Sequence, residues 1–193
     1  MAVNLFEEIV RSAVQAQGYL TIENVCYRRH ENAKGVVGTS DAHIASDIDL
    51  IAIAPHRQGH RRVLAVNIKG GREELRLPTA RDRILNRSTA CVAGSPAKSG
   101  YRELVDPDWR AAFKHAVHGA TRESVFTHVT VCKRISGDRR LWTEEPEFRL
   151  LTPHLLLCDV EDLLRWIGRR QDRLFANSTA IHLSDLASAV RAA

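Results

Sequence analysis

Two short apolar segments in the first half of the chain place the strongest constraint on its fold. Residues 47–54 read DIDLIAIA and residues 62–69 read RVLAVNIK, and a short connection that contains proline and glycine separates them. Both segments have the length and the β-branched content of strands, and most of their consecutive positions are apolar. A strand that is apolar on both faces is buried on both faces. The sequence therefore predicts a two-stranded hairpin at the centre of a sheet.

The rest of the chain supplies elements that can cover this sheet. With 193 residues, the chain is long enough for one domain with a substantial core, spanning residues 1–193. The order of elements predicts an α/β fold in which a central mixed β-sheet is covered on both faces. Apolar periodicity and capping residues predict helices at residues 5–17, 79–92, 106–119 and 160–167, and a last helix that begins at Ser184. Further strands are predicted at residues 19–27, 126–133 and 155–158. Loops are predicted at residues 28–45 and 94–101.

Composition excludes several classes of protein. Hydrophobic residues make up 44% of the chain and charged residues 26%, which argues against a disordered chain. No apolar run approaches the roughly 18 to 20 residues of a membrane helix, and Glu7 and Glu8 stand where a signal peptide has its apolar core. We therefore expect a cytoplasmic protein with no membrane partner. The four cysteines form no CxxC pair, and the net charge of +5 is compatible with a polyanionic partner.

Polar residues gather at one end of the predicted hairpin. Asp49 lies near the start of the first strand, and Asn67 and Lys69 lie at the end of the second. Because side chains alternate along a strand, Asn67 and Lys69 share a face, and Asp49 joins them if residue 49 lies opposite residue 67. A carboxylate and an amide oxygen can bind a divalent cation, and a nearby ammonium can orient a water and stabilise charge on a phosphate. This register leaves an apolar floor beneath the three residues, made of Ile51, Ile53, Val63 and Ala65.

Three segments are informative as an ordered set. They are FEEIVRSAVQAQGY at residues 6–19, SDIDLIAI at 46–53 and VLAVNIKG at 63–70. In this combination the chain resembles the PD-(D/E)XK nuclease superfamily, and its closest likeness is to the Mrr-like restriction endonucleases. The segment HLLLCDVEDLLRWI at 154–167 is similar to the closing strand and helix of Mrr-like domains. The resemblance implies a three-layer α/β/α restriction-endonuclease-like fold with a central mixed β-sheet.

The resemblance also implies a role for four residues. Glu7 matches the acidic residue of the first helix, Asp49 the metal-binding aspartate, Asn67 the second strand position and Lys69 the catalytic lysine. All four are candidate catalytic residues, and Glu7, Asp49 and Asn67 are candidate metal ligands. Each also has a structural alternative. Asp49 and Lys69 can form a weak surface ion pair, Glu7 can stabilise a helix N-terminus, and Asn67 can hydrogen-bond a neighbouring backbone group. The implied function is metal-dependent hydrolysis of DNA phosphodiester bonds in restriction, defence or repair, with Mg²⁺ or Mn²⁺ as cofactor.

One position departs from the family pattern. The family usually has Glu or Gln where this chain has Asn67, which offers a single neutral oxygen to a metal ion. Active members with a neutral amide at this position exist, so two hypotheses stay open. The chain is either an active nuclease or a degenerate nuclease-fold module that binds nucleic acid or a protein partner. Glu73 and Glu74 are alternative sources of the missing carboxylate.

Arginines that follow the hairpin are candidates for DNA contacts. Arg72, Arg76 and Arg83 come shortly after Lys69, where DNA would approach a site at this end of the hairpin, so we expect them to contact phosphates. Acidic residues interrupt the run, and a solvated helix of mixed charge is the alternative. The oligomeric state also stays open, and a homodimer and a larger defence or repair complex are both compatible with the sequence.

Overall fold

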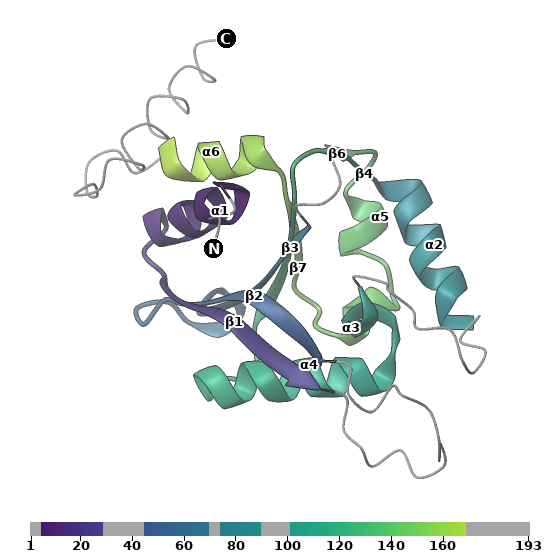
Figure 1. Ribbon diagram of the computed structural model, residues 1–193, viewed down its shortest axis with the longest axis horizontal. Helices are drawn as coiled ribbons and strands as arrows, with labels where there is room; N and C mark the ends of the chain where they lie inside the picture. Colours follow the sequence, from purple (N-terminus) through teal and green to yellow (C-terminus); the bar gives the residue numbers. More distant parts are fainter. Residues whose placement is uncertain (1–4, 29–44, 70–73, 90–100, 169–193) are drawn as a thin grey trace.

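The computed structural model describes residues 5–28, 45–69, 74–89 and 101–168, which form a mixed α/β fold around a five-stranded sheet (Figure 1). The strands are β1 (Leu20–Arg28), β2 (Ala45–Ile53), β3 (Val63–Lys69), β5 (Thr127–Cys132) and β7 (Leu155–Cys158), and they lie in this order across the sheet. β2 is antiparallel to both of its neighbours, β1 and β3, whereas β5 runs parallel to β3 and β7 runs parallel to β5. The predicted α/β class and the mixed sheet are therefore confirmed.

The predicted hairpin is formed by β2 and β3, which lie inside the sheet with a neighbour on each side. Leu50 pairs with Val66 and Ile51 with Ala65, which is the register that places residue 49 opposite residue 67. Ile51, Ala65 and Val63 are fully buried, as expected for the floor beneath the polar end. The tendency of long apolar strands to be buried on both faces explains why this hairpin occupies the interior of the sheet.

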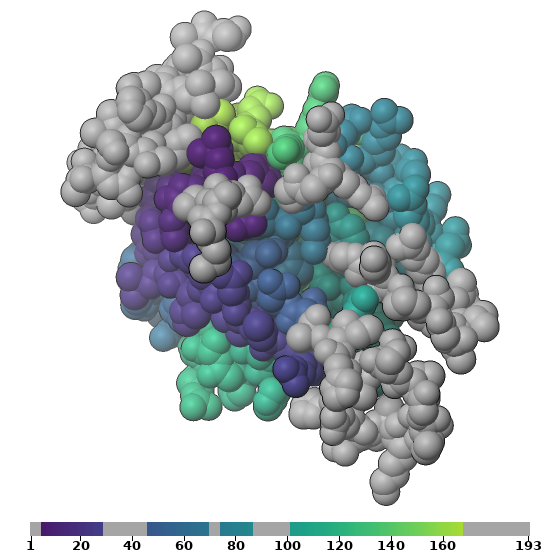
Figure 2. All heavy atoms as spheres, in the orientation of Figure 1, coloured from purple at the N-terminus to yellow at the C-terminus, as the bar shows by residue number. Residues whose placement is uncertain are grey.

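Helices cover both faces of the sheet. On one face α1 (Leu5–Ala16) and α6 (Val160–Gly168) lie side by side, and α4 (Pro107–Thr121) runs across the other (Figure 1). The core under α1 and α6 includes Val10, Leu163, Leu50 and Val66, and the core under α4 includes Phe113, Val117, Ile51 and Val63. In Figure 2 the side chains of β1, in purple, and of α4, in green, are neighbours at the lower edge of this view.

Several short elements were not predicted from the sequence. They are α3 (Arg102–Val105), α5 (Arg140–Thr143) and a parallel pair formed by β4 (Leu75–Arg76) and β6 (Ile135–Ser136), with 3-10 turns at Gly59–Arg61 and Phe148–Leu150. The weak helix expected at 79–92 is α2 (Leu77–Thr89). Elements of two to four residues are too short to display a periodicity, so apolar spacing cannot reveal them.

Glycine was predicted to end two helices, and this prediction holds for α1 but not for α4. Gly18 has φ 83° just after α1, a left-handed conformation that ends the helix as predicted. The prediction that α4 ends at Gly119 is wrong, because the helix continues to Thr121. Ala120 packs against the core, so burial favours two further helical residues, and Arg122 ends the helix with φ 63°.

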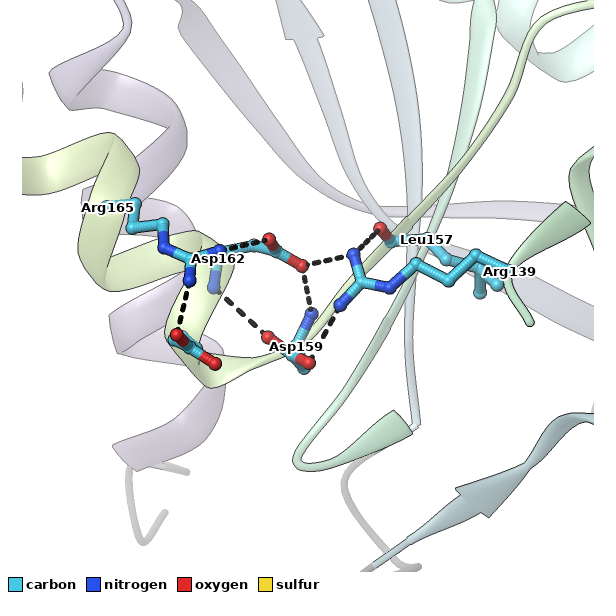
Figure 3. Close-up of polar contacts among 6 residues, drawn as sticks. Arg139, Leu157, Asp159, Asp162 and Arg165 are labelled. Carbon is cyan, nitrogen blue, oxygen red and sulfur yellow. Dashed lines mark hydrogen bonds and ion pairs between the residues drawn. The ribbon is translucent and has the colours of Figure 1, made fainter. Parts of the chain in front are cut away.

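A polar network fixes the start of α6 (Figure 3). The backbone N–H of Asp162 donates to Asp159 Oδ1 at 3.1 Å, and that of Asp159 donates to Asp162 Oδ2 at 3.2 Å. Arg139 donates to both carboxylates, at 2.9 Å for Asp159 and 2.6 Å for Asp162, and to the carbonyl of Leu157 at 3.3 Å. Arg139 thereby ties the end of β7 and the predicted cap of α6 to the residues that precede α5.

Some sequence predictions lie outside the described residues. These are most of the loop at 28–45, residues 94–100 of the second loop and the helix from Ser184. None of the helices in the described part of the chain combines the length and the apolar character that a membrane span requires.

Candidate functional site

A local irregularity in β2 shapes the polar end of the hairpin. Pairing between β1 and β2 includes Glu23 with Leu50 and Val25 with Ile48, but it skips residues 24 and 49 between them. The skipped Asn24 has φ 54°, in the left-handed region. In a regular strand, residues that lie an odd number of positions apart point to opposite faces of the sheet. Ile48 and Ile51 are three positions apart but pack into the same core, so the regular alternation of side chains is interrupted near Asp49. The pairs on either side keep the same register, so the irregularity adds no residue to either strand.

Asp49 replaces a backbone acceptor where the ladder between β2 and β3 ends. The pairing stops at Leu50 and Val66, and beyond it the backbone N–H of Ile68 donates to Asp49 Oδ2 at 2.6 Å. Burial raises the pKa of Asp49, and the Ile68 N–H and the Lys69 charge oppose this change. The sequence predicted a face shared by Asp49, Asn67 and Lys69, and the structure brings all three to one pocket.

Asn67 is buried, with 2% of its surface exposed, and its amide has a defined orientation. Nδ2 donates to Glu103 Oε1 at 2.7 Å, whereas the amide oxygen Oδ1 is buried and has no hydrogen-bond partner. Because a carboxylate only accepts hydrogen bonds, Glu103 fixes the nitrogen end of the amide on its own side. An unpartnered buried oxygen is costly, which makes Asn67 Oδ1 a candidate for a ligand contact.

Glu103 is the site residue that the sequence did not reveal. It comes from the four-residue α3, it is 3% exposed, and its Oε1 lies 3.6 Å from Nε2 of the fully buried His128 on β5. Burial alone would raise the pKa of Glu103, but His128 and Lys69 together lower it, so the carboxylate is ionised at neutral pH. The only sequence signal was a charged residue between Tyr101 and Leu104, both of which are buried.

Lys69 supplies positive charge between the acidic groups. Its Nζ lies 5.1 Å from the centre of the Tyr101 ring, within range of a cation–π contact, and the side chain is half-buried. The Lys69 charge lowers the pKa of both Glu103 and Asp49. Lysine is therefore held next to the two carboxylates, with its ammonium available to a bound anion or water.

These groups border one pocket of about 210 Å³ at the end of the hairpin. A volume of this size admits several water molecules or a phosphate group with a hydrated ion. Asp47 also lines the pocket. Of the two alternative carboxylates, Glu73 lies outside the described residues, and Glu74 accepts a hydrogen bond from Arg76. The lining residues are Ser46, Asp47, Asp49, Asn67, Ile68, Lys69, Arg102 and Glu103.

The remaining predicted site residues lie around this pocket or beyond it. Glu7 is exposed on α1 and does not line the pocket, although its charge contributes to the raised pKa of Asp49. Arg76 and Arg83 are exposed on β4 and α2, and Arg72 lies outside the described residues. Exposure leaves both described arginines accessible to a large anionic partner, and it is equally compatible with a solvated helix face.

The donor atoms at the pocket suit a hard divalent cation. In proteins Mg²⁺ keeps several water ligands and binds one or two carboxylates together with substrate oxygens. Asp49 and the unpartnered Asn67 Oδ1 could supply two protein oxygens to such an ion. No group of three His, Cys, Asp or Glu side chains that could hold a metal ion occurs among the residues that the structure describes.

Comparison of the chain with known protein families, with curated proteins and with solved structures finds no match in any of the three.

Proposed function

We propose that this protein is a metal-dependent deoxyribonuclease of the PD-(D/E)XK type, with a three-layer α/β/α restriction-endonuclease-like fold and DNA as its substrate. The observation that carries the proposal is the convergence of Asp49, Asn67 and Lys69 on one pocket, with Asn67 Oδ1 buried and unpartnered. The order of elements around the sheet supports it, because the predicted catalytic strands are the central hairpin. DNA hydrolysis needs groups that hold a cation and neutralise a phosphate, and this pocket provides both.

Each of the three residues has a distinct task in this proposal. Asp49 and the Asn67 amide oxygen hold Mg²⁺ or Mn²⁺, which supplies Lewis-acid stabilisation of the phosphate when bound. Asp49 can use the oxygen that does not accept from Ile68 N–H. Lys69 orients the attacking water and stabilises negative charge that develops on the phosphate oxygens.

Glu7 has an indirect role in the proposed metal binding. Its side chain is exposed on α1, and its charge favours the protonated form of Asp49. A bound cation would relieve that repulsion, so Glu7 contributes to the negative field that attracts the ion.

Substitution of Asp49 and Lys69 tests the proposal directly. Asp49→Asn keeps an oxygen for the Ile68 N–H but removes the charge, and Lys69→Met keeps the apolar stem. We expect each variant to lose about 100-fold or more of Mn²⁺-dependent plasmid cleavage while its circular dichroism spectrum stays unchanged. Asp82→Asn, which removes an exposed carboxylate from α2, is the matched control and should cleave like the wild type. Wild-type cleavage by folded Asp49→Asn would remove this pocket from the mechanism.

A second candidate function is a nuclease-fold module that binds nucleic acid or a protein partner without cutting. It is favoured by Asn67, which offers one neutral amide oxygen and whose Nδ2 donates to Glu103. This alternative predicts DNA binding that does not change with Mn²⁺, and no heat of Mn²⁺ binding in calorimetry. The nuclease proposal predicts measurable Mn²⁺ binding that Asp49→Asn removes.

A further inference from the structure

A buried polar cluster adjoins the pocket, and two of its members, Asn67 and Glu103, line it. Asn67, Glu103, His128 and Thr130 are each at most 3% exposed, and they come from β3, α3 and β5. Asn67 pairs with Thr130 across the parallel ladder, and Ala65 with His128, so the cluster spans two neighbouring strands. Burying an ionised carboxylate here is costly unless its partners compensate for the lost hydration. The cluster therefore needs a reason beyond stability.

Glu103 fixes the orientation of the Asn67 amide, and both residues line the pocket. An amide can present either an acceptor oxygen or a donor NH₂ group, and only the oxygen can bind a cation. The 2.7 Å contact between Asn67 Nδ2 and Glu103 Oε1 keeps the NH₂ group on the Glu103 side. The opposite orientation would place two oxygens in contact, which the negative charge of Glu103 makes strongly unfavourable. Oδ1 is consequently the end that remains free.

His128 holds Glu103 from the neighbouring strand. Its Nε2 lies 3.6 Å from Glu103 Oε1, and its ring packs edge-on against Phe113 with 5.5 Å between ring centres. Neither ring nitrogen has a hydrogen-bond partner within the described structure, and Glu103 is an acidic group within 4 Å of Nε2. Packing against a buried aromatic ring restricts the imidazole, and its proximity favours the ionised carboxylate.

We infer that Glu103 is a positioning residue, which acts through Asn67 by fixing the amide oxygen toward the cation site, with His128 as its support. The inference rests on the proposed function, because it assumes that Asn67 Oδ1 is a metal ligand. Glu103 itself does not bind the ion. Its carboxylate orders the neutral amide before the ion arrives, so less conformational freedom is lost on binding.

A double-mutant cycle on the full chain separates this role from a direct one. The variants are Glu103→Gln, Asn67→Ala and their combination, and the readout is Mn²⁺ affinity by calorimetry. We expect Glu103→Gln to weaken Mn²⁺ binding about 10-fold when Asn67 is present and less than about 2-fold when residue 67 is alanine. Equal losses in both backgrounds would identify Glu103 as a ligand in its own right and overturn the inference. A lower melting temperature with unchanged Mn²⁺ affinity would assign Glu103 a purely structural part and overturn it too.

The same measurements distinguish failure of this inference from failure of the proposed function. If wild type binds no Mn²⁺, or if Asp49→Asn binds it as well as wild type does, the metal site and the inference both fail. If Asp49→Asn loses binding but Glu103→Gln does not, only the inference fails. His128→Gln provides a second variant should Glu103→Gln not fold. It is expected to weaken Mn²⁺ binding only when Asn67 is present, and an equal loss without Asn67 would overturn the inference.

Discussion

Replacing Asn67 with aspartate tests the buried contact with Glu103 through stability, independently of activity. In the wild type the Asn67 Nδ2 group donates to Glu103 Oε1 at 2.7 Å. Aspartate has nearly the same shape but no donor, so the substitution brings two carboxylates together where both side chains are almost fully buried. We expect the variant to fold less stably at neutral pH.

Two routes give the size of this loss. Two unit charges about 4 Å apart repel by about 4 kcal/mol at an effective dielectric constant of 20. The protein can instead protonate one carboxyl, which costs about 1.4 kcal/mol for each pH unit above its ordinary pKa, or about 4 kcal/mol at pH 7. Both routes predict a free energy of unfolding about 4 kcal/mol below that of the wild type. For a chain of this size the melting temperature should fall by roughly 10 °C.

The pH dependence has a definite sign. In the variant one carboxyl of the pair has a raised pKa in the folded state, so its stabilising protonation is present at low pH and lost as pH rises. The deficit should therefore shrink as pH falls from 8 to 5. In the wild type the pKa of Glu103 is lowered, because His128 and Lys69 outweigh the opposing effect of burial. The contribution of ionised Glu103 to the stability of the wild type is therefore present above the ordinary carboxyl pKa. It is lost only as pH falls through the lowered pKa of the folded state.

Thermal unfolding followed by circular dichroism at pH 5 to 8, first without divalent ions, provides the measurement. Gln58→Glu adds the same charge at an exposed position that makes no side-chain capping bond, and it should change stability by less than about 0.5 kcal/mol. A deficit below about 1 kcal/mol at pH 7, or one that is the same at every pH, would refute the contact. If the pocket binds Mg²⁺, the added carboxylate should also lower the Mg²⁺ concentration needed for half-maximal binding, and an ion at 100 times its dissociation constant should restore about 2.7 kcal/mol.

Three further predictions concern packing, capping and DNA. Phe113→Ala empties a fully buried position in the core under α4 and should reduce the free energy of unfolding by about 3 to 5 kcal/mol in urea titration, whereas a loss below 1 kcal/mol would contradict its core position. Asp106 accepts from the N–H groups of residues 108 and 109, so Asp106→Ala should cost about 1 kcal/mol in the same assay, and no change would show that the cap is dispensable. Replacing Arg72, Arg76 and Arg83 together by glutamine should weaken DNA binding and flatten its dependence on salt. An unchanged dependence of DNA affinity on salt would assign these arginines to a solvated surface.

The sequence by itself determined the central hairpin and its polar end. Residues 47–54 and 62–69 are apolar at consecutive positions, and burial on both faces is the only arrangement that removes all of this surface from water. Once the two strands pair, alternation of side chains restricts which residues can meet, so Asn67 and Lys69 were expected on one face and Asp49 near them. The helices α1 and α6 were also predictable, since each carries a continuous apolar stripe and a local end signal.

Only the tertiary structure brought Glu103 and His128 to the site. Glu103 contacts Asn67 across 36 positions of the chain, from a helix of four residues that shows no periodicity in the sequence. His128 lies on a strand with polar and apolar residues, THVTVC, all of which are buried in the structure, and this pattern does not indicate that His128 faces a carboxylate. The interruption of β2 at Asp49 likewise appears only when the pairing with β1 is known. Short-range patterns report which surfaces must be buried, whereas the pairing of isolated polar groups depends on how the complete chain packs.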